Sequence, residues 1–471
     1  MEKSNETEKS EPITYRELKI STFELLYIKE LKVTGNINNH STLNLVGILP
    51  EDKKDEDIHT SYNTPIKVYA VTDKGEEPIY YGIITKIKVK KNADYYELHI
   101  EAQSYTYLMD IQRRNRSFQD KNMNINELIY GITRAYGKGG CNSYISDGAT
   151  ERLWVQYDET DWEFVKRVAS YYNVGLIVSI TLEGVHYFVD TPELQTKNIE
   201  INEYTATKLI QDYDVIREND LPDSNEIDYI TYTVQSYELL DLGDNISFKS
   251  RSFYVSELTY EIEDSILQNT YVLKLKGGQK QGRLYAQQLC GISLEGNVIE
   301  VTGDKIKVKL DIDKEQDQST AYWFNYSTLA ASPDGSGWYF MPEINDRVRI
   351  YFPTHDEKDA YSISCIQQIK GDPDVKYIAT IYGKKVIFTK DRVTITANNN
   401  ATIVLGKSGT ISITGDNSIN LNASETITLR AEDSIIISGK NNVDISCDKG
   451  GKALFEGSGN IVLDGTKVRI N

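Results

Sequence analysis

The stretch Ile403-Val404-Leu405-Gly406-Lys407-Ser408-Gly409-Thr410-Ile411-Ser412-Ile413 contains two copies of a unit that repeats every eight residues. Each unit starts with an apolar-any-apolar triplet, and six successive triplets begin at positions 403, 411, 419, 427, 435 and 443. Looser copies stand at 386–388, 393–395, 461–463 and 468–470. Residues i and i+2 share one face of a strand, so each triplet predicts a short strand with one apolar face. The intervening residues are rich in Gly, Asn, Ser, Thr and Asp, which form turns.

The two apolar positions of each octad define a predicted inward face. Its residues are Ile403, Leu405, Ile411, Ile413, Ile419, Leu421, Ile427, Leu429, Ile435, Ile437, Val443 and Ile445. A single-chain β-helix needs about 20 or more residues per coil, so one octad is too short to close a coil. We therefore expect three identical chains around one axis, where each layer buries about six side chains at roughly 1.5–3 kcal/mol each, before the ordering cost. The alternative for this stretch alone is a single-chain β-solenoid.

The charge of the chain is unevenly distributed. The formal net charge is −18, but residues 386–471 contain nine Lys plus Arg and nine Asp plus Glu, so the acidic excess lies upstream of them. An acidic protein of this kind is a poor nucleic-acid binder, because neutralising phosphates requires clustered Lys and Arg. A length of 471 residues leaves room for three or four domains.

The cysteines and the first residues of the chain indicate where the protein is made. Cys141, Cys290, Cys365 and Cys447 are far apart and form no Cys-x-x-Cys motif, so neither a zinc ribbon nor a dense disulfide framework is predicted. Residues 1–10 are acidic and polar, which predicts a disordered leader and no signal peptide. We expect assembly in the cytoplasm, followed by ejection only through a dedicated machine.

The first half of the chain alternates strand patterns with one clear helix. Runs at 43–48, 66–71, 80–84 and 96–100 alternate or are continuously apolar between turn residues, which predicts a barrel-like β domain over 11–115. Thr160-Asp161-Trp162-Glu163 fits a capping box, so a helix should begin there. Runs at 176–180 and 186–189 should follow it as a hairpin.

The stretch Tyr157-Asp158-Glu159-Thr160-Asp161-Trp162-Glu163-Phe164-Val165-Lys166-Arg167-Val168-Ala169, followed by Gly175, carries a family resemblance. It resembles the E-S/T-D-W-E-F-x-x-R-L-A…G signature of VgrG proteins and phage late control protein D, the hub subunits of contractile injection machines. The matching residues are Thr160, Trp162, Phe164, Arg167 and Gly175, with Val168 in place of the usual Leu. The resemblance implies a first hub β-barrel over 11–115, an α+β hub domain over 116–205 and a second hub β-barrel over 206–287.

A second resemblance follows a polar linker around residues 276–289. Five expected strands at 297–301, 306–310, 337–342, 346–352 and 362–366 are typical of an OB-fold barrel, which we place over 288–371. The segment from Gly337 to Phe352 is similar to the G-x-x-F-x-P-x-x-G-D-E-V-x-V-x-F segment of the spike OB domain. Asn345-Asp346-Arg347 stands where Gly-Asp-Glu is usual. OB barrels often bind single-stranded nucleic acid, but this chain lacks the basic groove for it.

Hub, OB barrel and octad repeat follow the order of VgrG and of the phage cell-puncturing spike. The resemblance implies a mainly β homotrimer whose octad region, 376–471, is a triple-stranded β-helix that we call the needle. The hub would sit on an inner tube of Hcp-like protein among baseplate proteins, and contraction would drive the needle through a target membrane. The chain ends directly after a needle strand, so we expect no fused effector and a separate PAAR-like tip protein, bound at Ile461, Leu463, Val468 and Ile470.

No chemistry is expected in this chain: no catalytic, cofactor or metal site, and no enzyme activity. About twenty residues separate barrel and needle, too few for the lysozyme domain that some phage spikes carry. The histidines all lie upstream of the needle, which argues against a histidine-ligated metal tip: His40, His59, His99, His186 and His355. The segment 311–317 imitates a calcium loop, but Gln316 and Tyr322 replace its Gly and Glu, so a solvated loop is expected.

The alternative function is a β-helical carbohydrate-active enzyme or a receptor-binding fibre. Catalysis on a β-helix needs acidic and basic residues clustered on one exposed face, whereas the needle's charges are sparse and mixed in sign. The sequence leaves open whether the machine is a type VI secretion system, a phage tail, a tailocin or an extracellular injection particle.

Overall fold

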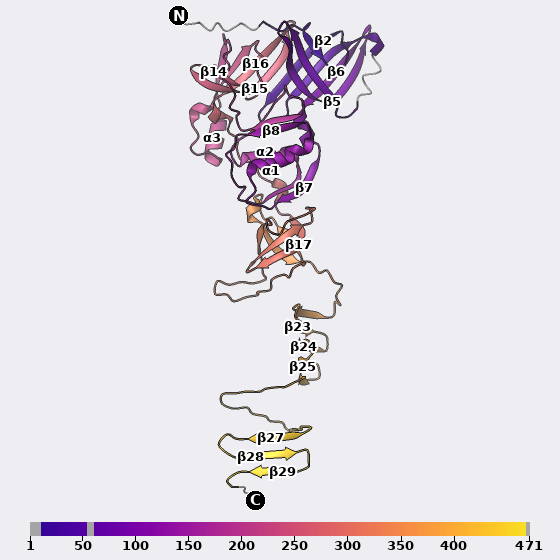
Figure 1. Ribbon diagram of the computed structural model, residues 1–471, viewed down its shortest axis with the longest axis vertical. Coiled ribbons are helices and arrows are strands. Elements are labelled where there is room, and N and C mark those ends of the chain that lie inside the picture. Colours follow the sequence, from indigo (N-terminus) through magenta and orange to yellow (C-terminus); the bar gives the residue numbers. More distant parts are fainter. Residues whose placement is uncertain (1–10, 54–60, 468–471) are drawn as a thin grey trace. The chain divides into compact units, whose positions relative to one another are not determined.

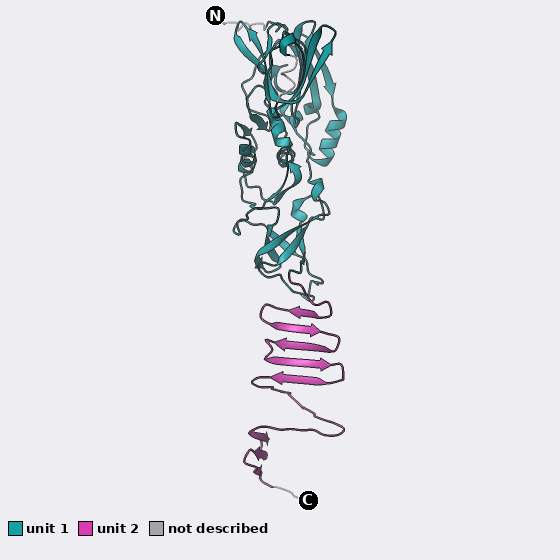
Figure 2. Ribbon diagram, turned by 90° about the vertical axis from the view of Figure 1, so that its right-hand side faces the viewer, with its two compact units in different colours: residues 1–368 teal, residues 369–471 magenta. Residues whose placement is uncertain are grey.

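The computed structural model describes residues 11–53 and 61–467, so the expected disordered leader, residues 1–10, lies outside the described residues. The chain divides into two compact units, residues 1–368 and 369–471 (Figure 2). Strands dominate both units, which confirms the mainly β fold class. None of the described helices is both long and apolar enough to cross a membrane.

One large sheet forms the hub (Figure 1). Its strands are β1 (Leu18–Ile20), β2 (Tyr27–Asn36), β3 (Thr42–Leu49), β4 (Pro65–Thr72), β5 (Gly75–Asn92), β6 (Tyr95–Ser104), β12 (Tyr204–Lys208), β13 (Ile230–Ser236), β14 (Asn245–Phe248), β15 (Arg251–Glu263) and β16 (Ile266–Lys274). The order is β1-β4-β5-β6-β3-β2-β15-β16-β13-β12, with β14 paired to β15. The four strands expected from the sequence are β3 to β6. The β2–β15 pairing joins the two segments that we expected as separate barrels.

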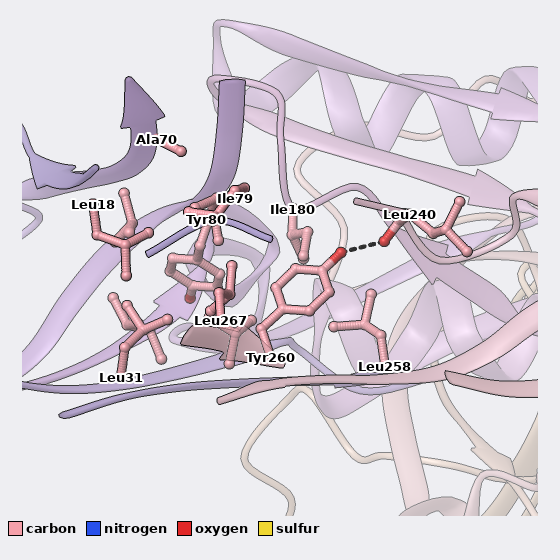
Figure 3. Close-up of a cluster of buried hydrophobic side chains, with 14 of the residues drawn as sticks. Leu18, Leu31, Ala70, Ile79, Tyr80, Ile180, Leu240, Leu258, Tyr260 and Leu267 are labelled. Carbon is pink, nitrogen blue, oxygen red and sulfur yellow. Dashed lines mark hydrogen bonds between the residues drawn. The ribbon is translucent and has the colours of Figure 1, made fainter. Parts of the chain in front are cut away.

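The hub core draws side chains from both ends of this sheet (Figure 3). Tyr80 of β5 and Tyr260 of β15 are fully buried and use their hydroxyls to satisfy buried carbonyls. Tyr260 donates a hydrogen bond to the Leu240 carbonyl, and Tyr80 donates to the Ser41 carbonyl at 3.2 Å. The buried Ile180, from the segment between β10 and β11, packs in the same cluster. The two sequence segments therefore fold around one core.

The α+β segment packs two helices on short strands. Its elements are β7 (Arg113–Phe118), α1 (Ile125–Thr133), β8 (Gly139–Ser143), β9 (Trp154–Thr160), α2 (Asp161–Ser170), β10 (Leu176–Val178) and β11 (Val185–Val189). The capping box is confirmed, because the Thr160 hydroxyl accepts from the Glu163 N–H while the Glu163 carboxylate accepts from the Thr160 N–H. The expected hairpin is the antiparallel β10–β11 pair. A third helix, α3 (Ile210–Asn219), has no buried residue and no counterpart in the sequence prediction.

The OB barrel is closed, in the order β17-β18-β19-β21-β20. Its strands are β17 (Ser293–Thr302), β18 (Lys305–Leu310), β19 (Trp323–Tyr326), β20 (Arg347–Tyr351) and β21 (Tyr361–Cys365). The strand expected at 337–342 was wrong, because the barrel takes 323–326 instead. Phe324 is fully buried inside the barrel, whereas Trp338 and Tyr339 are exposed in the loop that follows β19.

The needle unit contains two antiparallel sheets (Figure 2). The first is β22 (Lys376–Ala379), β23 (Lys384–Phe388), β24 (Arg392–Ala397), β25 (Ala401–Gly406) and β26 (Ile411–Gly415). The second is β27 (Asn442–Ser446), β28 (Lys452–Glu456) and β29 (Ile461–Asp464). The triplets that begin at 419, 427 and 435 carry no strand, contrary to the expectation that every triplet is one. An extended segment needs a hydrogen-bonded neighbour to be a strand, and a single chain supplies none to these three.

Candidate functional site

The signature residues of α2 are interior. Trp162 is almost completely buried and donates from Nε1 to the Asn38 carbonyl at 3.3 Å, in the turn between β2 and β3. Phe164 is also buried and stacks on Phe118 of β7, with the ring centroids 5.4 Å apart. Trp162 therefore ties α2 to the β2–β3 turn of the hub sheet, while Phe164 packs in the core of the α+β segment.

Gly175 lies directly against the turn between β2 and β3 of the hub sheet. A Cβ atom at this position would lie 2.4 Å from Cγ2 of Ile37, which is far inside van der Waals contact. Next to it, the Leu176 N–H donates to the Asn38 side-chain oxygen at 2.8 Å. The signature glycine is thus explained by the lack of room for any side chain.

Arg167 is the centre of a buried ion network that joins the hub to the OB barrel. Its Nε and Nη2 atoms donate to the two carboxylate oxygens of Glu159, both at 2.8 Å. Its Nη1 donates to Oε1 of Glu357 at 2.8 Å, and Nη2 also donates to the Val155 carbonyl at 2.8 Å. Arg167 is 2% exposed and Glu357 is 0% exposed. Glu357 lies between barrel strands β20 and β21, so this pair crosses from one domain to the other.

A second arginine completes the network. Arg152 donates to Oε2 of Glu357 at 2.9 Å and to Oδ1 of Asp356 at 2.6 Å. Burial alone would lower the pKa of Arg167, but the charges of Glu357 and Glu159 outweigh burial and hold that pKa above its ordinary value. Arg167 therefore stays charged across the physiological range. We call Arg152, Glu159, Arg167 and Glu357 the joint.

Strand β9 takes part in two cores at the joint. Trp154 packs in the core of the α+β segment, together with Phe164. Its neighbours Leu153 and Val155 point the other way and pack in the barrel core, together with Leu294. Since alternate residues of a strand face opposite sides, one strand ties the two domains together without a flexible hinge.

A second polar link runs beside the joint. The Ser117 N–H and hydroxyl donate to the two carboxylate oxygens of Asp313, at 2.6 and 2.5 Å. Asp311 accepts two hydrogen bonds from Arg347, at 2.7 and 2.6 Å. The segment 311–317 was expected to be a solvated loop, and Asp311, Lys314, Glu315 and Asp317 are exposed, whereas Asp313 is half-buried against Ser117.

The linker around 276–289 is held against the hub. The Gln281 N–H donates to the Asn173 carbonyl at 3.1 Å, and the Leu284 N–H donates to the Ser170 hydroxyl at 2.9 Å. Further along, the rings of Tyr285 and His355 lie 4.1 Å apart. The chain between hub sheet and barrel is therefore a fixed strap, which adds a third connection between the two domains.

The octad face of the needle is exposed in the single chain. Eleven of its twelve apolar residues are between 38% and 69% exposed, and Val443 is half-buried. In the β22–β26 sheet the strand register places four of them, Ile403, Leu405, Ile411 and Ile413, in two columns with apolar residues of the preceding strands. The first column is Ile378, Val386, Ile395, Ile403 and Ile413. The second column is Phe388, Val393, Leu405 and Ile411.

A hollow of about 590 Å³ follows the first column on the face of the β22–β26 sheet. Its lining is mainly apolar and includes Val386, Ile395 and Ile403. Soluble monomers rarely expose a continuous apolar surface of this kind, so the face needs a partner. Of the expected tip-protein residues, Ile461 and Leu463 are exposed on β29, whereas Val468 and Ile470 lie outside the described residues.

Two functional residues were missed from the sequence. Glu357 and Asp313 each sit in a charged run between barrel strands, Asp356-Glu357-Lys358-Asp359 and Asp311-Ile312-Asp313, and such runs are normally solvated. Their partners are about 190 residues away along the chain. The sequence held no local signal for them, because the carboxylate nearest to Arg167 in the signature, Glu159, already pairs with it.

Comparisons with known proteins agree with the fold. Residues 295–366 match the family model of the type VI secretion system/phage-baseplate injector OB domain, and residues 24–224 match that of the Alg8 N-terminal domain. Each match covers less than half of the chain. No curated protein matches the chain.

Solved structures match a larger share of the chain. The E. coli c3393 protein, a type VI secretion component described as similar to the T4 bacteriophage tail proteins gp27 and gp5, has a TM-score of 0.55 and 13% identity, over 74% of this chain and 99% of that one. A chain of the Francisella PdpA-VgrG complex, lidded, has a TM-score of 0.52 and 9% identity, over 82% of this chain and 76% of that one. The predicted resemblance to VgrG and phage spike proteins is confirmed at the level of the fold.

The joint predicts a specific stability effect. Replacing Glu357 with Ala leaves Arg167 and Arg152 buried with one partner fewer, and breaking a buried ion pair costs about 3–5 kcal/mol. Urea unfolding followed by tryptophan fluorescence should show this loss in the free energy of unfolding. The control is Glu261→Ala, which breaks the exposed 2.8 Å pair with Lys32 and should cost no more than about 1 kcal/mol. Equal unfolding midpoints for the two variants would contradict the role given to the joint.

Proposed function

We propose that this chain is the homotrimeric central spike of a contractile injection machine, in which the needle transmits the force of contraction to a target envelope. The observation that carries the proposal is the exposed, column-stacked octad face. The OB-domain match and the shared fold with a type VI secretion component support it. The domain bounds predicted from the sequence, from the hub barrels to the needle at 376–471, are part of this proposal.

Three chains account for what one chain leaves unsatisfied. Each layer of a trimer buries two apolar side chains per chain, at about 1.5–3 kcal/mol each before the ordering cost. Neighbouring chains also provide strand partners for the triplets at 419, 427 and 435, which have none in the single chain. The needle is then a triple-stranded β-helix whose backbone groups pair between chains.

The rigid connection between hub and barrel suits a part that bears load. The joint, the shared strand β9 and the strap connect hub and barrel rigidly, which suits a part that carries load and performs no catalysis. The hub would sit on an Hcp-like inner tube among baseplate proteins, after assembly in the cytoplasm, and the needle would meet the target membrane after ejection. Nucleic acid is no partner of so acidic a chain. The carbohydrate-active or fibre alternative would require glycan cleavage or binding by the isolated protein.

The trimer is tested by mass. The chain has a mass of 53.6 kDa, so three copies should give a species of about 160 kDa in light scattering or native mass spectrometry. Burial of the octad face requires the assembly, so dilution should not release folded needles. A stable monomer with a protease-resistant needle would disprove the three-chain model.

The inward face is tested within one triplet. Ile427→Asp would place three carboxylates together in a dry layer, and an unpaired buried charge costs several kcal/mol unless it is protonated. The needle should lose its resistance to protease and detergent. Thr428→Asp is the matched control, because residue 428 would face the opposite side of the strand that this triplet forms in the proposed trimer, and its carboxylate would stay in water. If both variants behave alike, the inward face has been assigned wrongly.

A PAAR-like tip protein is part of the proposal. Strand β29 forms an edge of its sheet and exposes Ile461 and Leu463, and exposed strand edges with apolar residues invite association. Deletion of residues 461–471 should abolish copurification of a small tip protein with the spike. The trimer should survive, since the layers from Ile403 to Ile445 remain. A complete particle without density beyond residue 471 would contradict the tip assignment.

A further inference from the structure

The loop between β19 and β20, residues 327–346, presents an unusual set of apolar side chains to solvent. Five of them are between 49% and 88% exposed: Leu329, Trp338, Tyr339, Phe340 and Ile344. Such a concentration within sixteen residues exceeds the scattered apolar residues of an ordinary surface and marks an interaction site. The Tyr339 hydroxyl donates to the Gly303 carbonyl of its own chain at 2.9 Å, but the Tyr339 ring stays 75% exposed.

The loop has a defined structure of its own. Residues 328–340, which we call the aromatic hairpin, fold back on themselves through an N–H···O bond from Trp338 to Ala330 at 2.8 Å and a bridge between Ala331 and Gly337. At its turn, Asp334 accepts from the Ser336 N–H at 2.9 Å. A Cβ at Gly337 would lie 2.3 Å from the Ala330 carbonyl oxygen, so the hairpin requires glycine there. These contacts order the hairpin without burying its aromatic rings.

The same barrel also has a hollow whose lining, like the hairpin, combines aromatic rings with polar groups. Strands β19 and β21 pair in parallel over only two residue pairs, Asn325 with Tyr361 and Tyr326 with Ser362. Beside this seam lies an open hollow of about 510 Å³, lined by Asn325, Tyr326, Ser327, Lys358, Asp359, Ala360 and Tyr361. The lining combines two aromatic rings with polar groups, which suits side chains with an apolar body and a polar tip, such as Tyr and Trp. The chain's own hairpin contributes no residue to this lining.

The occupant that fits best is a second copy of this chain. This step rests on the proposed trimer: barrel strand β21 and needle strand β22 are joined by ten residues, 366–375, so three chains that share a needle hold their three barrels at a high local concentration. A contact between barrels would continue the needle interface into the preceding domain. A hairpin on one copy and a hollow on the next form a head-to-tail contact, which closes into a ring of three.

We propose that the aromatic hairpin of each chain fills the hollow at the β19–β21 seam of its neighbour, so that the three OB barrels are clasped into a ring. The clasp covers the shortest strand pairing of the barrel. It also stabilises the trimer independently of the needle layers.

The native cysteines allow a direct test in the full-length chain. Cys365 ends β21 at the seam, with its Sγ 3.6 Å from the Tyr326 hydroxyl, and is exposed. In a background with Cys290→Ser and Cys447→Ser, the variant Tyr339→Cys places a thiol on the hairpin. Treatment with a short bismaleimide should link position 339 of one chain to Cys365 of another, giving covalent dimers and trimers. The peptide pair is identified by mass spectrometry.

Matched variants decide the outcome. Tyr62→Cys in the same background puts a thiol on a hub tyrosine that is even more exposed than Tyr339, and the yield of linkage to Cys365 should be at least about ten-fold lower, as expected without a shared interface. Adding Cys365→Ser should remove the product. Leu329→Cys, at another exposed hairpin position, serves as a second probe. A trimeric protein in which neither hairpin thiol links to Cys365 between chains would overturn the clasp alone, whereas a monomeric mass for the unmodified chain would overturn the proposed function itself.

Discussion

The guanidinium of Arg167 is the contact on which the arrangement of hub and barrel depends. It is buried and charged, and it is stable there only because Glu159 from the hub and Glu357 from the barrel both reach it. Each partner compensates part of the desolvation cost, so removing either one leaves a charge without an adequate counterion. Such a network tolerates little displacement, because charged hydrogen bonds weaken quickly with distance and angle. Hub and barrel are therefore held in one relative geometry.

The needle is stabilised by a different kind of interaction. The twelve residues of its octad face are all Ile, Leu or Val, and apolar burial is non-directional, so burying this face would supply free energy of association in proportion to area. The alignment of these side chains comes from the strand register, which places Ile395 beside Ile403 and Ile403 beside Ile413. In the proposed trimer, charged hydrogen bonds would fix the geometry within the first unit, and apolar burial would hold the three needles together.

The sequence predicted what local patterns determine. The capping box at Thr160, strands β3 to β6 and four of the five barrel strands follow from periodicity and turn chemistry over a few residues. The structure differs from the sequence prediction where contacts between distant residues determine the outcome. Glu357 pairs with Arg167, which is 190 positions away. The strand with the buried Phe324 takes the barrel position that was expected for residues 337–342. The triplets at 419, 427 and 435 satisfy the strand pattern but lack a partner in one chain. Helix α3 has no buried residue. It therefore has no continuous apolar face, which is the pattern that would have predicted it from the sequence.

The two units differ in whether one chain completes their hydrophobic core. Each of the three hydrophobic clusters of the first unit is complete within one chain, with cores around Tyr260, Trp162 and Phe324. Folding of that unit is therefore unimolecular. The octad face has no such core within one chain. In the proposed trimer its order would therefore depend on other chains and on their concentration. Folded hubs and barrels would then precede the needle, and contacts between barrels would raise the local concentration of octads before the first needle layer closes.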